Sequence, residues 1–350
     1  MKTLSIKGSR GQSDIHVGDS LDNLERYVPN DRRLVIITDR VVHDLYGGRF
    51  PNADVITIGT GEKIKSLATL ENILDRLIEM ETDRSTFIVG VGGGIVCDIT
   101  GFAASVYLRG IDFGYVSTTL LAQVDASVGG KTGVNFGGYK NMVGVFNQPV
   151  FVICDTVLLE TLPALEIACG FAEIVKHAII ADADMFAFLE QNSQKALNLE
   201  QSVIERLVYD SVGIKAGVVE RDEREKGERR ILNFGHTFGH AIEKTAGLRH
   251  GEAVGLGMVI AGALSVKKGL LHPDEQNRIV ALLESLGLPV CMEVDKEAVL
   301  DAIQKDKKRQ GDSIKFVLAD GLGKALVQDI TLGELEEIVF KETSILHRYR

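Results

Sequence analysis

Short apolar segments alternate with a helical pattern in the first 160 residues, and this alternation constrains the fold more than any other feature. Four segments rich in β-branched residues lie at 34–37, 55–58, 87–91 and 150–153. They are mostly apolar on both faces, which is typical of strands buried in a parallel sheet. Apolar residues between Leu67 and Ile78 recur at steps of three and four, which predicts an amphipathic helix. Together these segments predict a Rossmann-like, doubly wound α/β sheet that binds its ligands at the carboxyl ends of the strands.

The pattern changes after Leu162-Pro163. From about residue 165 to 310 the sequence shows successive helical patterns and few strand signals, and two short β-type runs follow within 314–327. We therefore predict an α/β domain at 1–163 and a mainly α-helical domain at 164–350. The active site is expected in the cleft between them, which is a common place for ligand pockets.

Composition narrows the class of protein. Hydrophobic residues make up 45% of the 350 residues, charged residues 25%, and the net charge is −10, which fits an ordinary globular protein and argues against nucleic acid or an anionic membrane as a partner. No apolar run is long enough to span a membrane, and the first residues lack the apolar core of a signal peptide. The four cysteines have neither metal-site nor disulfide spacing, so we expect reduced thiols in a cytoplasmic protein.

Histidines gather in one part of the helical region. Three of the eight in the chain, His236, His240 and His250, fall within fifteen residues, and Glu173 lies upstream on a predicted helix. One carboxylate oxygen and two imidazole nitrogens suit a catalytic zinc that keeps one position open, whereas magnesium and calcium prefer oxygen ligands. Spacing alone would also make His236 and His240, four residues apart, a ligand pair on one helix face.

The glycine run at 90–94 leads from a predicted strand into a helix. Its glycines allow a close approach to a ligand, and the helix N-terminus suits a pyrophosphate, although the spacing is not that of the common dinucleotide motif. Asp39 ends an earlier strand, where it would accept hydrogen bonds from a ribose or cap a helix. Glu62 and Lys65 lie in a segment that also has the composition of a solvated loop.

A segment dense in polar residues follows, in an otherwise apolar frame. Arg109, Lys131 and Lys140 are its basic residues. They could converge on an anionic substrate, because guanidinium and ammonium groups bind phosphate and carboxylate.

These motifs together resemble those of the 3-dehydroquinate synthase family, over nearly the whole chain. The residues that carry the resemblance are Leu120–Asp125, Gly129–Asn135, Lys140-Asn141, Phe171–Lys176, Leu232–Thr237 and His250–Ala253. The resemblance implies a cytoplasmic homodimer of the shikimate pathway, which leads to chorismate and the aromatic amino acids. It implies conversion of 3-deoxy-D-arabino-heptulosonate 7-phosphate to 3-dehydroquinate and phosphate. The implied cofactors are catalytic NAD and a zinc ion, with cobalt as a substitute.

The resemblance also assigns residues. It implies that Glu173, His236 and His250 bind the metal, and that His240 is reserved for proton transfer and phosphate contact. The implied NAD contacts are Asp39, Glu62, Lys65, Gly93, Gly94, Ile95, Asp98, Thr118, Thr119, Lys131, Lys140, Leu158, Leu159, Glu160 and Thr161.

The implied substrate contacts are Arg109, Asp125, Lys131, Lys140, Asn141, Lys176, Lys215, Arg229, Asn233, His240 and one of the pair Lys307 and Lys308. The residues implied in catalysis are His240, Glu225, Lys131, Lys176 and Asn233.

Two positions depart from the family pattern. Cys97 stands where glycine is usual before Asp98, and His177 stands where tyrosine is often found. The competing readings are another sugar phosphate cyclase of the 2-deoxy-scyllo-inosose synthase type, a metal-dependent polyol dehydrogenase that would release NADH, and an inactive NAD-binding or scaffold protein.

Overall fold

The computed structural model describes residues 1–8, 11–293, 295–304, 309–310 and 313–342. The chain forms two compact units. Unit 1 comprises Met1–Leu162 and Ile204–Arg224, and unit 2 comprises Pro163–Val203 and Glu225–Arg350. The chain therefore passes between the units three times. Separate domains at 1–163 and 164–350 stay a prediction, to which the structure adds that Ile204–Arg224 packs with unit 1.

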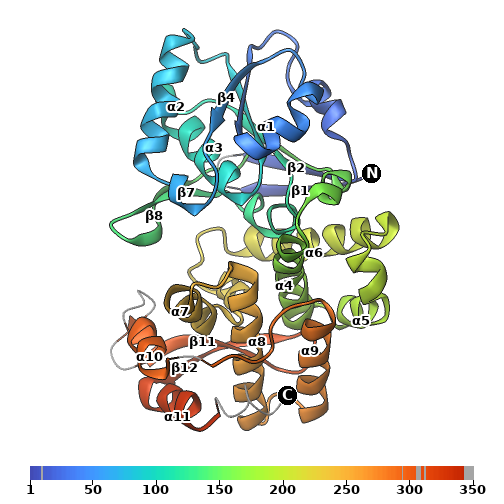
Figure 1. The fold of residues 1–350 in the computed structure, drawn as a ribbon, viewed down its shortest axis with the longest axis vertical. Helices are drawn as coiled ribbons and strands as arrows, with labels where there is room; N and C mark the ends of the chain where they lie inside the picture. Colours follow the sequence, from blue (N-terminus) through green and yellow to red (C-terminus); the bar gives the residue numbers. More distant parts are fainter. Residues whose placement is uncertain (9–10, 294, 305–308, 311–312, 343–350) are drawn as a thin grey trace. The chain divides into compact units, whose positions relative to one another are not determined.

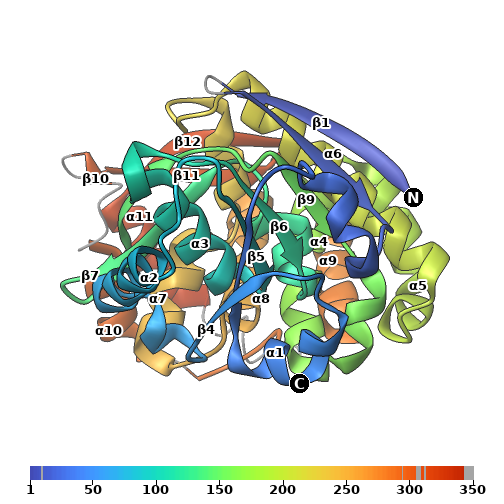
Figure 2. The same cartoon turned by 90° about the horizontal axis from the view of Figure 1, so that it is seen from above.

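Unit 1 is built on a seven-stranded sheet in the order β1-β2-β9-β6-β5-β3-β4 (Figures 1 and 2). All neighbouring strands are parallel except β1 and β2. The strands are β1 (Lys2–Gly8), β2 (Gly11–Val17), β3 (Leu34–Asp39), β4 (Asp54–Ile58), β5 (Phe87–Gly92), β6 (Phe113–Ser117) and β9 (Phe151–Cys154).

The four predicted strands correspond to β3, β4, β5 and β9, and the doubly wound α/β prediction is confirmed. The chain runs from β3 to β4 on one side and then returns to β5 on the other side of β3. Such a switch in direction opens a crevice at the carboxyl ends of the strands, where ligands of open α/β sheets bind.

Helices pack on this sheet, and a hairpin extends beyond it. Helix α2 (Leu67–Glu79) matches the predicted periodic segment and buries Leu70, Ile73 and Leu77. The other α-helices of this part of the chain are α1 (Arg40–Tyr46), α3 (Gly94–Val106) and α6 (Gln201–Arg221), whose first residues belong to unit 2. Strands β7 (Lys131–Phe136) and β8 (Tyr139–Phe146) form a separate antiparallel hairpin.

Unit 2 is mainly helical, as predicted. It contains α4 (Ala164–Ala181), α5 (Ala183–Leu197), α7 (His236–Ala246), α8 (His250–Lys267), α9 (Pro273–Ser285), α10 (Lys296–Gln304) and α11 (Leu332–Glu342). The predicted β pair is β11 (Ser313–Ala319) and β12 (Ala325–Thr331), to which β10 (Arg309–Gln310) adds a third strand.

Short helical segments join these elements: η1 (Leu21–Tyr27), η2 (Gly47–Arg49), η3 (Glu62–Ile64), η4 (Tyr107–Arg109), η5 (Ala122–Ala126), η6 (Thr156–Thr161) and η7 (Glu228–Asn233). None of the described helices has both the length and the apolar character that crossing a membrane requires.

Candidate functional site

Glu173, His236 and His250 lie together in unit 2. One possible ligand atom from each falls within 4.8 Å of the others. The Oε1 atom of Glu173 lies 3.5 Å from Nε2 of His236 and 3.3 Å from Nε2 of His250. A carboxylate oxygen and two imidazole nitrogens that face one point are the donor set of a three-ligand catalytic zinc site, so these residues fit the implied metal.

Helices α4 and α8 pack closely at a glycine, and this contact brings Glu173 beside His250. Glu173 lies in the middle of α4, one turn after Cys169, and His250 begins α8. A Cβ atom on Gly251, next to His250, would lie 2.3 Å from the Cα atom of Cys169. Only a glycine lets α8 approach α4 this closely, and that approach sets the separation of the two ligands.

A similar contact places His236. This residue begins α7, and its neighbour Gly235 has a φ of 78°, in the left-handed region that favours glycine. A Cβ atom on Gly257 of α8 would lie 1.9 Å from the carbonyl oxygen of Gly235. The first turn of α7 therefore rests directly on the backbone of α8, and His236 is held on the same side as His250.

The second ring nitrogen of each imidazole has its own partner. The Nδ1 atom of His236 lies 3.2 Å from the carbonyl oxygen of Phe234, and Nδ1 of His250 lies 3.4 Å from Oε2 of Glu243. In a neutral ring, an Nδ1–H that donates to either acceptor leaves Nε2 unprotonated and facing Glu173. Such outer partners fix the ring orientation of metal ligands.

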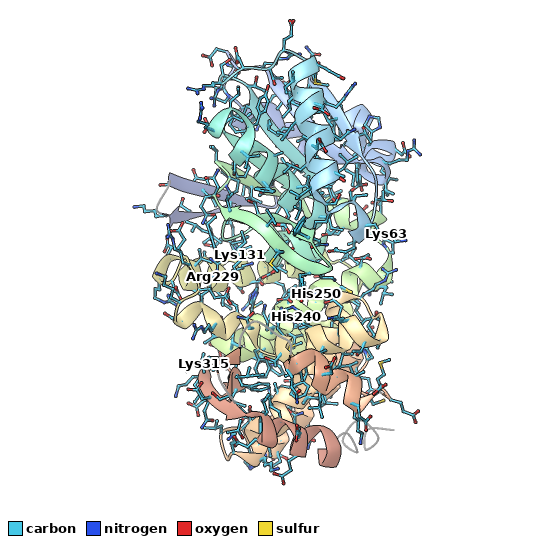
Figure 3. The ribbon with its side chains drawn as sticks, turned by 90° about the vertical axis from the view of Figure 1, so that its left-hand side faces the viewer. Lys63, Lys131, Arg229, His240, His250 and Lys315 are labelled. Atoms are coloured by element: carbon cyan, nitrogen blue, oxygen red, sulfur yellow. The ribbon has the colours of Figure 1, made fainter. Side chains whose placement is uncertain are left out.

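His240 lies one turn along α7 from His236 and is exposed. Its ring centroid is 5.2 Å from that of His236 and 6.1 Å from that of His250, and Figure 3 shows His240 and His250 side by side. His240, Glu243 and His250 also form a group that could hold a metal, but it lacks a fully buried member. We favour the group with Glu173, because its carboxylate and His236 are both buried and because these three residues are the ligands that the resemblance implies.

The charge states of Glu173 and His236 agree with this assignment. Burial opposes its ionisation, but the adjacent ammonium of Lys176 and the two imidazoles hold the pKa of Glu173 well below its usual value. Burial, together with Lys176, lowers the pKa of His236, so its ring is neutral and its lone pair is available. Burial also disfavours charge on His250, but hydrogen bonds to Glu173 and Glu243 outweigh it and raise the pKa to about 9.

Other expected residues of unit 2 lie in buried or constrained positions. Lys176 and Arg229 are almost fully buried. The side-chain amide of Asn233 donates to Oε1 of Glu225 at 2.5 Å, and Glu225 has a φ of 57°. Lys307 and Lys308 lie outside the described residues.

In unit 1 the expected NAD contacts follow the carboxyl ends of the parallel strands. Strand β3 ends at Asp39, and the strands β4, β5, β6 and β9 lead directly into the other segments. Those segments contain Glu62 and Lys65, Gly93–Ile95, Thr118 and Thr119, and Leu158–Thr161, respectively. Residues far apart in the sequence thus share one edge of the sheet, as the doubly wound fold predicts.

The glycine turn between β5 and α3 is tightly packed. A Cβ atom on Gly92 would lie 2.6 Å from the side chain of Val96, and one on Gly94 would lie 2.8 Å from Cβ of Ala126. Gly93 supplies no capping side chain to α3, so the start of this helix suits an anion. Cys97 is fully buried, and its Sγ lies 3.9 Å from the carbonyl oxygen of Gly92 in the turn.

Asp39 caps helix α1, because its Oδ1 accepts from the backbone N–H of Val42 at 3.0 Å. Burial raises the pKa of this carboxyl. The ribose contact of Asp39 stays a prediction.

A buried ion pair lies beside the expected cofactor site. Lys65 is 6% exposed, and its ammonium contacts Oδ2 of Asp98 and donates to Oδ1 of Asn141 at 2.5 Å. Burial raises the pKa of Asp98, which the charge of Lys65 opposes. In the same unit, Lys215 of α6 donates to the carbonyl oxygen and Oδ1 of Asp125, both at 2.6 Å.

The three basic residues expected to converge lie in separate segments of unit 1, and their convergence on a substrate stays a prediction. Lys131 starts β7 and pairs with Phe146 at the end of β8, whereas Lys140 lies beside the hairpin turn. The register therefore does not bring the backbones of Lys131 and Lys140 together. Arg109 lies in η4 with a φ of 70°.

Two neighbours of the expected sites are not evident from the sequence. Glu243 contacts His250 from within α7, seven residues earlier in the chain. The hydroxyl of Tyr46 lies 3.2 Å from the carbonyl oxygen of Leu158 and 2.6 Å from Oγ1 of Thr161, so it holds the segment after β9. Tyr46 lies 112 residues from Leu158 in the chain, and no local pattern links such residues.

Solved structures share this fold. A 2-deoxy-scyllo-inosose synthase complexed with carbaglucose-6-phosphate, NAD+ and Co2+ matches with a TM-score of 0.86 and 28% identity, over 97% of this chain and 99% of that one. ValA, a 2-epi-5-epi-valiolone synthase from Streptomyces hygroscopicus subsp. jinggangensis 5008 with NAD+ and Zn2+ bound, matches over all of both chains with a TM-score of 0.88 and 26% identity. The fold and the site therefore define a protein of the sugar phosphate cyclase class.

The family follows from the sequence. The family model of the 3-dehydroquinate synthase N-terminal part matches residues 55–169, and that of the C-terminal part matches residues 170–309. The 3-dehydroquinate synthase of a Nitratiruptor species is 47% identical over 283 residues, which is 80% of each chain. That of Caulobacter vibrioides is 42% identical over 333 residues, which is 90% of each chain. The chain belongs to the 3-dehydroquinate synthase family.

Proposed function

We propose that this chain is a 3-dehydroquinate synthase, a phosphorus–oxygen lyase of the shikimate pathway. It converts 3-deoxy-D-arabino-heptulosonate 7-phosphate to 3-dehydroquinate and phosphate, using NAD catalytically and one zinc or cobalt ion. Family membership supports this function, and the observation that carries it is the convergence of Glu173, His236 and His250 beside a buried lysine.

Glu173, His236 and His250 would hold the metal. When bound, the metal polarises the substrate alcohol as a Lewis acid, which makes its deprotonation feasible near neutral pH. Lys176 stabilises the negative charge of Glu173, and its position next to the metal ligands also suits stabilisation of charge that develops on a substrate oxygen. His240, exposed next to the ligands, and Glu225, held by Asn233, are the proposed proton carriers.

The segments after the parallel strands would hold NAD in unit 1. The start of α3 at Gly93–Ile95 receives the pyrophosphate, and Asp39 and Glu62 accept from the sugar hydroxyls. Bound there, NAD would supply a reversible acceptor for a substrate hydride. The substrate is anionic at its phosphate and its carboxylate, and the basic residues proposed to bind it are Arg109, Lys131, Lys140, Lys176, Lys215 and Arg229. A homodimer and a cytoplasmic location stay predictions.

The test is phosphate release from the heptulosonate phosphate with zinc and a small amount of NAD. Many turnovers for each NAD, without a steady rise in NADH absorbance, are expected. Stoichiometric NADH would indicate a polyol dehydrogenase instead. A parallel reaction with glucose 6-phosphate separates the proposed enzyme from a 2-deoxy-scyllo-inosose synthase, because activity on this sugar alone would contradict the proposal.

A further inference from the structure

Asn135, near the end of β7, joins the segment after β4 to strand β8. Its side-chain amide donates to Oε1 of Glu62 at 2.7 Å, and its Oδ1 accepts from the backbone N–H of Asn141 at 2.8 Å. Its own backbone N–H donates to the carbonyl oxygen of Lys65 at 2.9 Å. One residue thus uses its side-chain donor, its side-chain acceptor and its backbone donor on three different partners.

The partners of Asn135 are all residues of the expected ligand sites. Glu62 and Lys65 belong to the segment after β4, and Asn141 lies on β8. The network continues from Asn141, whose Oδ1 accepts from the ammonium of Lys65, to Asp98 on α3. A strand, a connecting segment and a helix therefore share one set of hydrogen bonds centred on Asn135.

The hydrogen bond to Asn135 also supports the left-handed backbone of Asn141. Asn141 has a φ of 51°, a left-handed conformation that is uncommon outside glycine and that asparagine tolerates better than most residues. Its N–H points to Oδ1 of Asn135, and its side chain is fixed by Lys65. Without the Asn135 side chain, Asn141 would lose the contact that orients its backbone.

We propose that Asn135 is a positioning residue for the dinucleotide: it holds Glu62 and Lys65 in the arrangement that binds NAD, and it holds Asn141, whose side chain fixes Lys65. This inference rests on the proposed function. Asn135 acts through its partners, since the residues it holds, not Asn135 itself, are the proposed ligand contacts. An asparagine is required because its side chain donates to a carboxylate and accepts from an N–H, whereas an ionised aspartate only accepts.

The test is the affinity for NAD of the metal-loaded full-length protein, measured by calorimetry with Asn135→Ala and Asn135→Asp. Each variant is expected to weaken NAD binding at least tenfold, or about 1.4 kcal/mol, with a smaller effect on turnover at saturating NAD. Asn147→Ala is the matched control. Its side-chain amide donates to Oγ of Ser105 at 2.9 Å, close to the same hairpin but away from Glu62. We expect it to leave NAD affinity within about twofold of the parent.

A reversal of the hydrogen bond tests the direct contact. In Asn135→Asp combined with Glu62→Gln, the new amide at position 62 can donate to the new carboxylate at position 135. This double variant is expected to bind NAD more tightly than Asn135→Asp alone, whereas a role of Asn135 that does not act through Glu62 predicts no such rescue.

The outcomes separate this inference from the proposed function. If the parent binds NAD and Asn135→Ala binds it equally well, or if Asn147→Ala weakens binding as much, the inference is overturned and the function stands. Absence of NAD binding by the parent overturns both. Thermal unfolding of each variant is measured in parallel. A loss of NAD affinity that merely follows a loss of stability, equal in Asn135→Ala and Asn147→Ala, also overturns the inference.

Discussion

At the scale of single residues, left-handed backbone marks several expected site positions. Arg109, Asn141 and Glu225 are three of the six described non-glycine residues with positive φ. Such conformations cost on the order of 1–3 kcal/mol each and persist where the surroundings hold them. Asn141 and Glu225 both have asparagine partners, Asn135 and Asn233, that hold them in place.

Lys176 should contribute most to the stability of the protein when the metal is absent. Replacing Lys176 by Met leaves the fully buried Glu173 without its ammonium partner, and breaking a buried ion pair costs roughly 3–5 kcal/mol. Bound zinc would restore the positive charge, so the loss should be smaller in the zinc-loaded protein. Urea unfolding of the metal-free and zinc-loaded forms measures this difference. An equal loss in both forms would contradict the proposed ligand role of Glu173.

Glu243 should tune the affinity for the metal. Because its carboxylate orients His250 through Nδ1, Glu243→Ala is expected to weaken zinc binding about 10–100-fold in a chelator competition. Glu243→Gln keeps an oxygen acceptor and should lose less. Glu190→Gln is the control. It removes the charge of a carboxylate that is paired with Arg278, and it should leave the zinc affinity unchanged. Equal zinc affinity in Glu243→Ala and the parent would contradict the orienting role.

At the scale of elements, the metal site depends on how closely α8 approaches its neighbours. Gly257→Ala would place a Cβ atom against the backbone of Gly235, so the first turn of α7 must move, and His236 with it. Overpacking of this kind typically costs about 1–3 kcal/mol. We expect lower stability and weaker zinc binding, measured by urea unfolding and by chelator competition.

Gly255→Ala is the matched control for this experiment, because it lies on the same helix and its added Cβ atom would meet no atom closer than 3.7 Å. Gly255→Ala should leave the free energy of unfolding unchanged or raise it by about 0.5–1 kcal/mol, because alanine is favoured over glycine in helices. A similar loss of zinc affinity in Gly255→Ala and Gly257→Ala would show that the backbone contact is not the cause.

The sequence predicts those elements whose pattern is local. Strands β3, β5 and β9 are continuous apolar runs, and α2 has a regular apolar face, so both kinds of element are recognisable. Strand β6 is not recognisable from the sequence, although all its residues are buried. Gly114 and Ser117 leave it with only three large apolar residues, Phe113, Tyr115 and Val116. The hairpin β7–β8 also escapes prediction, because its burial does not follow the polarity of its residues: Phe136 and Tyr139 are exposed.

The same distinction applies to the site. The resemblance named Glu173, His236 and His250, and the structure brings them together. What the sequence could not supply are the contacts across long separations, such as Tyr46 with Thr161 or Lys215 with Asp125. These contacts depend on the strand order and on α6, which no local pattern specifies.

At the scale of the whole molecule, unit 1 is discontinuous in the chain. The segment Ile204–Arg224 belongs to it, and Lys215 of this segment is bound to Asp125. A second link is the backbone N–H of Lys7 on β1, which donates to Oε1 of Glu220 at 3.0 Å. The sheet alone is therefore not the complete unit.

A fragment of residues 1–163 should consequently be less stable than unit 1 in the full chain. Addition of a peptide of residues 204–224 is expected to raise its urea midpoint, and the same peptide with Lys215→Ala should do so less, because the contact with Asp125 is lost. If the fragment were as stable without the peptide as with it, residues 1–163 would form a complete domain.

The discontinuity also has a consequence for synthesis. A ribosome completes the strands of the sheet by residue 154, but the last segment of unit 1 ends only at Arg224. Between Leu162 and Arg224, at about 5–20 residues per second, translation takes about 3–12 s. During this interval the newly made sheet lacks α6, and the residues of unit 2 that are already made, Pro163–Val203, lack α8 and α9, against which α4 and α5 will pack. A nascent chain would thus hold two incomplete units at once, so this is the stage of its production at which we expect a chaperone to bind it.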